Sequence, residues 1–371
     1  MVSWRETLSR LGLALGSLVF TLLLAEIALR GWGFTPEAYK STARLVSTDQ
    51  RTLLDCYPTN PRAYFTTDLR APAARRRYLH LAPHRYDAVA QRAPWAVEFR
   101  YNTGGFRGPE FSPKRPGVFR VAVLGDSFTE GQGVEEPDTY PRVLEKLLNA
   151  AEPGRFEVLN FGRRATDFPA LYGIFEAILS LAPDVVVYGM TPNDPERSAA
   201  FEARQNYVND WILNRGRMLI GRPDHALGFF ESRVVALVQD RIESYRTGRE
   251  TLRWYREMFG DGNREGWENT KTYLKQMNAR TRAQGGAFLL VSWPLLVGLE
   301  GRYPLEDVDT LVARTCTTAG IERHDLLPVL RGRPPSSLWV HPVDMHPNEL
   351  ANRLAAESVA PLVLRLASGS R

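Results

Sequence analysis

The chain has 371 residues, of which 44% are hydrophobic and 24% are charged. A chain this long and this apolar belongs neither to the disordered tails nor to the small disulfide-stabilised proteins. Its net charge is +5, but its basic residues form no run of five or more, the densest cluster being Arg75-Arg76-Arg77. Because binding to nucleic acid needs a concentrated basic patch, we expect no nucleic-acid partner.

The longest apolar run lies in the first thirty residues. Residues 11–29 contain one charge, Glu26, and Trp4 and Trp32 flank the run. Nineteen helical residues span about 28 Å, close to the thickness of the hydrocarbon layer of a membrane. Tryptophans at both ends are typical of the membrane interface. We therefore predict a transmembrane signal anchor at residues 11–30, after a short cytoplasmic segment at residues 1–10.

A cleaved signal peptide is the alternative interpretation of the same run. No small-x-small cleavage motif with a polar mature start follows Ala25, which favours the uncleaved anchor. Arg5 and Arg10 precede the run, whereas Arg30 alone follows it closely. This excess of basic residues before the run favours a cytoplasmic N-terminus, with the remainder of the chain in the periplasm or at the cell surface.

From residue 118 onward, short apolar runs alternate with amphipathic stretches. This alternation predicts an α/β domain at residues 118–371, with a parallel sheet covered by helices on both faces and its site at the carboxyl ends of the strands. Residues 195–265 interrupt the rhythm and are predicted to be a mainly helical insertion above the active-site edge. Residues 31–117 are predicted to be a stalk and lead-in region. The predicted strands cover residues 97–101, 118–124, 156–160, 184–188, 287–292 and 321–324, and the predicted helices cover residues 138–151, 168–182, 266–284, 306–318 and 347–366.

Four polar segments lie beside the ends of these predicted elements. Alone, each is typical of a turn or a helix cap, but a serine, an aspartate and a histidine in this arrangement suit nucleophilic catalysis. An aspartate two residues before a histidine can orient its imidazole, and that imidazole can take the proton of a serine hydroxyl. The segments are, in order, Gly125-Asp126-Ser127-Phe128, Asn160-Phe161-Gly162, Pro192-Asn193-Asp194 and Asp344-Met345-His346.

The ordered set of segments resembles the four sequence blocks of the SGNH/GDSL hydrolase superfamily. The resemblance covers residues 118–368 and implies the SGNH hydrolase fold, a flavodoxin-like three-layer sandwich with a parallel sheet. It implies that Ser127 is the nucleophile, His346 the general base and acid, and Asp344 the residue that orients His346. It also implies an oxyanion hole formed by the backbone N–H groups of Ser127 and Gly162 and the side chain of Asn193. Such chemistry requires neither a metal ion nor an organic cofactor.

Two positions depart from the usual family pattern. One residue, Met345, separates Asp344 from His346, where the family commonly has two. This spacing resembles the Asp-x-His arrangement of the polysaccharide O-acetylation branch. Thr191 stands two residues before Asn193, where a glycine is common.

We interpret the chain as a membrane-anchored serine esterase that cleaves O-acetyl or other acyl groups from glycans or lipids of the cell envelope. Its expected partners are an ester-bearing small molecule, lipid or glycan, and the membrane. One alternative is an O-acyltransferase that uses the same triad to acylate an envelope polysaccharide. Another is a catalytically inactive, membrane-tethered binding or assembly factor, although the intact serine, histidine and aspartate argue against it.

Several other residues are weaker candidates for function, and for each of them a structural role is favoured. They are His341 as an alternative base, His324-Asp325 at a strand end, Arg163 and Arg164 as contacts for an anion, and Trp211, Trp254 and Trp267 as platforms for sugar rings. The two cysteines, Cys56 and Cys316, are 260 positions apart and outside any CxxC or Cys/His cluster, which excludes a zinc site of the usual spacing. Whether they form a disulfide stays open.

Overall fold

The computed structural model describes residues 4–34, 65–67, 77–80, 95–204, 230–341 and 344–369. It describes the backbone alone for the residues of these ranges before Phe99 that form strands, for residues 240, 243, 244, 246 and 247, and for His341 and Asp344. The chain divides into two units. The first consists of residues 1–50 and 210–251, and the second of residues 51–209 and 252–371.

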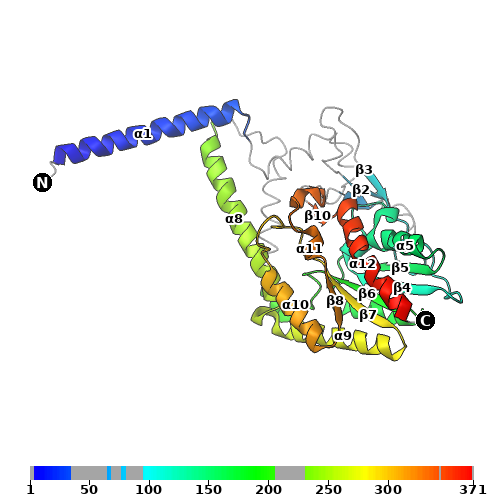
Figure 1. Cartoon of the computed structure of the whole chain (residues 1–371). Coiled ribbons are helices and arrows are strands. Elements are labelled where there is room, and N and C mark those ends of the chain that lie inside the picture. The colour runs from blue at the N-terminus through cyan, green and yellow to red at the C-terminus, as the bar shows by residue number, and fades with distance from the viewer. Residues whose placement is uncertain are drawn as a thin grey trace. The chain divides into compact units, whose positions relative to one another are not determined.

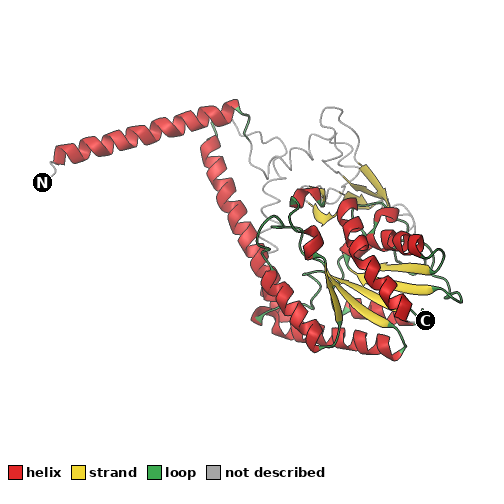
Figure 2. Cartoon of the chain, viewed as in Figure 1, coloured by secondary structure: helices red, strands yellow, loops and turns green. Residues whose placement is uncertain are grey.

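A five-stranded parallel sheet forms the centre of the second unit (Figure 2). Its strand order is β5-β4-β6-β7-β8, so the first strand along the chain, β4, lies between the second and the third. The chain therefore moves in opposite directions along the sheet before and after β5, and the carboxyl end of β4 is the switch point where open α/β sheets place their ligands. The strands are β4 (Phe119–Gly125), β5 (Phe156–Gly162), β6 (Val185–Met190), β7 (Ala287–Ser292) and β8 (Glu322–Asp325).

Helices cover both faces of this sheet and complete a three-layer sandwich. Right-handed crossovers place α5, which links β4 to β5, on the opposite face from α6 and α9, because the chain reverses direction along the sheet between them. The contacts agree, since α5 packs against α12 and α6 packs against α9. The predicted fold class is thus confirmed. The covering helices are α5 (Tyr140–Ala151), α6 (Ala170–Leu179), α9 (Arg264–Ala283), α10 (Glu306–Thr318) and α12 (Glu349–Gly369).

Shorter elements surround the carboxyl edge of the sheet. The five strands and five helices predicted from residue 118 onward are all present, each with its ends within three residues of the predicted ones. The predicted strand at residues 97–101 is displaced, since β3 ends at Glu98. The remaining elements of this unit are β1 (Phe65–Thr67), β2 (Arg77–His80), β3 (Trp95–Glu98), α4 (Ser127–Glu130), α11 (Leu327–Leu330), β9 (Trp339–His341), β10 (Asp344–Pro347) and the 3-10 helices Glu136–Asp138, Asp261–Asn263 and Pro335–Ser337.

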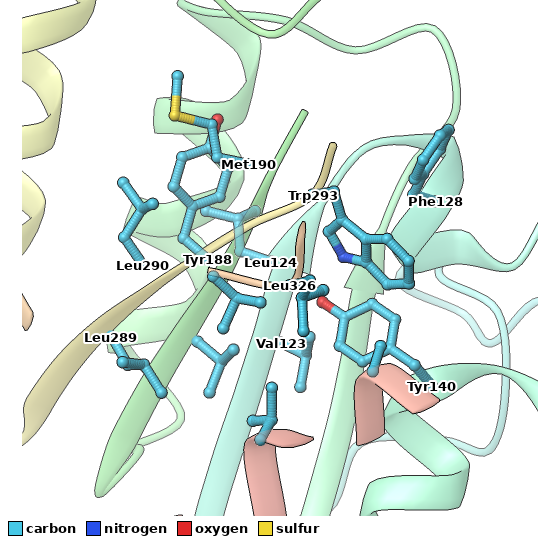
Figure 3. Close-up of a cluster of buried hydrophobic side chains, with 14 of the residues drawn as sticks. Val123, Leu124, Phe128, Tyr140, Tyr188, Met190, Leu289, Leu290, Trp293 and Leu326 are labelled. Atoms are coloured by element: carbon cyan, nitrogen blue, oxygen red, sulfur yellow. The ribbon is translucent and has the colours of Figure 1, made fainter. Parts of the chain in front are cut away.

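The core lies along both faces of the central strands. Every residue of β4 and β6 is buried. This explains why their sequences are mostly apolar throughout, rather than alternating between apolar and polar residues. Figure 3 shows Trp293, which follows β7, beside Phe128 and Tyr140, with ring centroids 5.6 and 5.5 Å away. These aromatic side chains pack together beside the turn that follows β4. The turn that contains Ser127 therefore lies against closely packed aromatic side chains.

The first unit contains α1 (Trp4–Gly31) and the first part of α8 (Arg233–Met258), which runs on into the second unit (Figure 1). α1 is long and apolar enough to cross a membrane, with a mean hydropathy of 2.1 over its most apolar window, and none of its residues is buried. The carboxylate of Glu26, near its end, accepts hydrogen bonds from Ser232 Oγ, Arg233 N and Val234 N at 2.9, 2.9 and 3.0 Å. This one side chain therefore caps the N-terminus of α8.

Candidate active site

Ser127 is the first residue of α4, directly beyond the carboxyl end of β4. Asp126 caps this short helix, since its Oδ1 accepts a hydrogen bond from Phe128 N at 2.9 Å. Gly125 is the last residue of the strand. The position is a glycine because a Cβ atom there would lie 2.1 Å from Thr129 Oγ1 and 2.9 Å from Gly189 O. The glycine thus lets the turn approach the neighbouring strand closely, and Ser127 remains 9% exposed at the switch point.

His346 lies near the C-terminal end of the domain and faces Ser127, which lies near its start. Its Nε2 atom lies 2.8 Å from Ser127 Oγ, although 219 positions separate the two residues. His346 belongs to β10, which pairs antiparallel with β9, and its ring packs edge-on against Phe128 with 5.3 Å between centroids. The two residues predicted as nucleophile and base are therefore in hydrogen-bond contact, the geometry that activates a serine hydroxyl.

The other ring nitrogen of His346 faces a residue that the sequence reasoning missed. Gln132 Nε2 lies 3.1 Å from His346 Nδ1, and the Gln132 side chain is buried. Glycines flank Gln132 on both sides, with φ of +79° at Gly131 and +83° at Gly133. That Gly-x-Gly pattern just after the nucleophile was the available signal, because positive φ at two such positions forces a tight turn back toward the site.

Asp344, predicted to orient His346, has its backbone in β10, but its side chain lies outside the described part of the structure. A histidine that acts as a general base needs its proton on Nδ1 and a lone pair on Nε2. The group that faces Nδ1 therefore has to accept a hydrogen bond. Asp344 stays the predicted acceptor, and the Gln132 carboxamide also carries an oxygen that suits this role.

Two of the predicted oxyanion-hole donors, Asn193 and Gly162, already take part in hydrogen bonds with neighbouring side chains. Asn193 lies beyond β6, where its Oδ1 accepts from Thr191 Oγ1 at 2.9 Å and its Nδ2 lies 3.4 Å from Asp126 Oδ2. The N–H of Gly162 donates to Asn160 Oδ1 at 2.8 Å. Gly162 would have to share or release that hydrogen bond to act as a donor, so its role stays a prediction.

Gly162 has a packing role that explains why the position is a glycine. A Cβ atom there would lie 2.0 Å from Glu130 N and 2.4 Å from Thr129 C. The end of β5 thus packs directly on the backbone of α4. Ala165, three residues further on, has φ of +53°, a conformation that residues other than glycine rarely adopt. Backbone strain of this kind accumulates at functional sites, and here it lies in the loop after β5.

Two carboxyl groups, those of Asp126 and Asp194, are buried near Ser127. Burial raises the pKa of Asp126, and burial together with the nearby charge of Asp126 raises the pKa of Asp194 well above its usual range. Asp194 Oδ2 accepts from Tyr188 O–H at 2.7 Å and from Thr191 N–H at 2.9 Å. The two carboxyl groups and Thr191 therefore form one polar cluster beside Asn193.

Most of the weaker candidates make contacts that suit a structural role. The guanidinium of Arg164 pairs with Glu130 at 2.7 Å and lies over the Phe99 ring, whereas Arg163 is exposed. His324 Nε2 lies 2.6 Å from Ser358 Oγ, and burial lowers the pKa of His324. The structure describes neither Cys56 nor Trp211 nor the side chain of His341. Three further candidates pack in the core: Trp254 is half-buried, Trp267 is buried, and Cys316 is a buried free thiol whose pKa is raised by burial to about 11.

Among the described residues, no group of three or more His, Cys, Asp or Glu side chains could hold a metal ion.

The family model for GDSL-like lipases and acylhydrolases matches residues 123–354, more than half of the chain. The chain belongs to the GDSL-like lipase/acylhydrolase family. The match begins within β4 and ends within α12, so it includes the carboxyl end of β4, the other four strands of the parallel sheet and all four polar segments. Family membership makes the protein a serine hydrolase that acts on ester bonds.

Solved structures with a related fold share little sequence with this hydrolase. A protein assigned to the lipolytic G-D-S-L family from Desulfitobacterium hafniense is 16% identical, with 66% of this chain and 99% of that chain covered and a TM-score of 0.39. A catalytic mutant of Axe2, an acetylxylan esterase from Geobacillus stearothermophilus, is 13% identical, with coverages of 67% and 96% and a TM-score of 0.41. LAE5, an alpha/beta hydrolase from the metagenome of Lake Arreo, is 15% identical, with coverages of 69% and 98% and a TM-score of 0.40. A comparison with curated proteins found no match.

Proposed function

We propose that this hydrolase is a membrane-anchored esterase that removes O-acetyl or other acyl groups from glycans or lipids of the cell envelope. The observation that carries the proposal is the 2.8 Å contact between Ser127 Oγ and His346 Nε2. This contact joins a hydroxyl that is a weak nucleophile at neutral pH to a base that can take its proton. The apolar helix α1 supports the choice of substrate, because a tethered enzyme meets lipids and envelope polymers first.

In the proposed cycle, Ser127 Oγ attacks the carbonyl carbon of the ester while His346 Nε2 takes the hydroxyl proton. The bond to the alcohol then breaks, His346 returns the proton to the departing alcohol oxygen, and the acyl group stays on Ser127. Water, deprotonated by His346, attacks this acyl-enzyme. The bond between the acyl carbon and Ser127 Oγ then breaks, His346 returns the proton to Oγ, and the acid is released. Asn193 and the N–H groups of Ser127 and Gly162 would stabilise the oxyanion, and Asp344 would hold the imidazole in its working orientation.

Release of acid from short-chain nitrophenyl esters and from acetylated glycans tests this function. Ser127→Ala in the full chain is expected to lower kcat by about 10⁴-fold or more, because the nucleophile is lost. The matched control is Ser180→Ala, an exposed serine at the end of α6, which should keep wild-type activity. Equal activity of wild type and Ser127→Ala would contradict the mechanism. Adding a glycan acceptor distinguishes transfer to sugar from hydrolysis, since only a transferase would yield acylated glycan.

The capping of α8 by Glu26 supports a retained anchor over a cleaved leader. Glu26 belongs to α1, and Arg30 of the same helix also donates to Glu231 O at 3.0 Å. Cleavage after Ala25 would leave Glu26 at a new chain end without the helix that positions it. We therefore propose that α1 stays attached as a single membrane span, with the catalytic unit outside the cytoplasm.

Mass spectrometry of the protein from the membrane fraction tests the anchor. Peptides from residues 1–30 should be present in the mature protein, and carbonate washing should leave the protein in the membrane. Protease added to the extracytoplasmic side should digest the catalytic unit. A soluble protein without these N-terminal peptides would contradict the anchor without affecting the proposed chemistry.

A further inference from the structure

The hydroxyl of Thr191 is surrounded by three oxygen atoms. Thr191 Oγ1 lies 2.8 Å from Asp194 Oδ1, 2.9 Å from Asp126 Oδ2 and 2.9 Å from Asn193 Oδ1. Both aspartates and Thr191 are buried, with at most 1% of each residue exposed. Water therefore has little access to this cluster, and its hydrogen bonds have to be satisfied by the four groups themselves.

Counting protons shows that this cluster cannot contain two ionised carboxylates. A threonine hydroxyl donates one hydrogen bond and can accept two. With both aspartates ionised, two carboxylate oxygens would compete for that one proton, even if the Asn193 amide turned to present its nitrogen. A carboxylate oxygen 2.8–2.9 Å from a hydroxyl oxygen without a proton between them would be repelled. At least one of the two carboxyl groups therefore carries a proton.

The contacts of Asp194 place that proton on one particular atom. Its Oδ2 already accepts two hydrogen bonds, from Tyr188 O–H and from Thr191 N–H. Its Oδ1 faces Thr191 Oγ1, so a proton on Oδ1 completes the set. Burial of Asp194 and the nearby Asp126 carboxyl group both raise its pKa, in agreement with a protonated group. Asp126 Oδ2 lies 2.9 Å from the same Thr191 Oγ1, and burial raises the pKa of Asp126 as well, so a proton on this Oδ2 leaves the Thr191 hydroxyl proton for Asn193.

We propose that Thr191 is a positioning residue for Asn193, and that a protonated Asp194 carboxyl group donates to Thr191 to hold it in place. Asp194 Oδ1–H and Asp126 Oδ2–H donate to the two lone pairs of Thr191 Oγ1, and the Thr191 hydroxyl then directs its own proton to Asn193 Oδ1. Accepting at Oδ1 fixes the Asn193 amide with its Nδ2–H groups turned away from Thr191, where one of them can meet an oxyanion. This inference rests on the proposed esterase function, because it concerns the orientation of an oxyanion-hole donor.

A double-mutant cycle separates positioning from mere structural support. Asn193→Ala is expected to lower kcat by about 10²–10³-fold with little change in KM, as expected for loss of one oxyanion donor. Thr191→Val, which removes the hydroxyl but keeps the shape, should lower kcat about tenfold or more with KM near wild type. In the Asn193→Ala background, Thr191→Val should cause no further loss, and Thr191→Ser should restore activity in the wild-type background. Thr317→Val, on the exposed side of α10, is the matched control.

Variants of Asp194 test the location of the proton. Asp194→Asn can donate from its amide nitrogen to Thr191 as a protonated carboxyl group does, whereas Asp194→Ala cannot. We expect Asp194→Asn to have a kcat about tenfold above that of Asp194→Ala, the value of one buried hydrogen bond. This pair keeps the proposal testable if Thr191→Val does not fold, as judged by circular dichroism.

Three results would overturn the inference. These are losses that multiply in the double mutant, a change confined to KM, and equal activity of the two Asp194 variants. Ser127→Ala in the same assay distinguishes these failures from failure of the esterase function. If Ser127→Ala is inactive while the cycle is multiplicative, the esterase function stands and the positioning role of Thr191 does not.

Discussion

Helix α1 and strand β4 of this hydrolase are both rich in apolar residues, but they differ in what surrounds them. All seven residues of β4 are buried, whereas none of the 28 residues of α1 is. Leu124 of β4 is 0% exposed and Leu15 of α1 is 65% exposed. Hydrophobicity alone therefore does not separate a core element from a membrane element. Length does, because seven residues fit inside a domain while a run of nineteen matches a bilayer.

The largest expected contrast comes from shortening one leucine in each region. Leu124→Ala should lower the free energy of unfolding of the catalytic unit by about 2–5 kcal/mol, because it leaves a cavity in a closely packed sheet. Leu15→Ala should leave that free energy within about 0.5 kcal/mol of wild type, since the Leu15 side chain is 65% exposed. Urea unfolding of the detergent-solubilised chain, followed by loss of esterase activity, measures both. Equal destabilisation would contradict the difference in burial between these two leucines.

A smaller contrast is expected from adding one methyl group in each region. Gly162→Ala would place a Cβ atom 2.0 Å from Glu130 N, whereas Gly16 of α1 has nothing within 4 Å of such an atom. Gly162→Ala should therefore cost about 1–3 kcal/mol by overpacking, and Gly16→Ala should be neutral. The same urea unfolding measures the difference. A fully stable Gly162→Ala variant would show that β5 and α4 can separate without strain.

The smallest effect is expected where α1 meets α8. Glu26→Ala removes the acceptor of two backbone N–H groups, so it should weaken the first turn of α8 by about 0.5–2 kcal/mol. Hydrogen exchange of the Arg233 and Val234 amides in the full chain should become faster. Glu250→Ala, an exposed change on the same helix, serves as the control and should leave both rates unchanged. Unaltered exchange in Glu26→Ala would mean that the cap adds no stability, while the esterase activity should be unaffected in either case.

The sequence predicted the order of the elements because each strand and helix is specified by a local pattern of apolar residues. The long run at residues 11–29 and the alternation of strands and helices both depend on neighbours along the chain. The polar segment around Ser127 could also be placed, because a buried strand that ends in Gly125 and Asp126 marks the edge of a parallel sheet. The resemblance to a known family then paired Ser127 with His346, which no local pattern could have done.

Tertiary structure alone decided which groups surround these residues. Gln132 faces His346 across 214 positions of sequence, and Thr191 meets Asp126 across 65. The Gly162 N–H, predicted to be an oxyanion donor, is engaged by Asn160, and the position is a glycine because β5 packs on α4. Such features depend on atoms within about 3 Å of each other, a precision that only the packed fold supplies. The sequence therefore determined where the chemistry lies, and the fold determined how its donors, acceptors and protons are arranged.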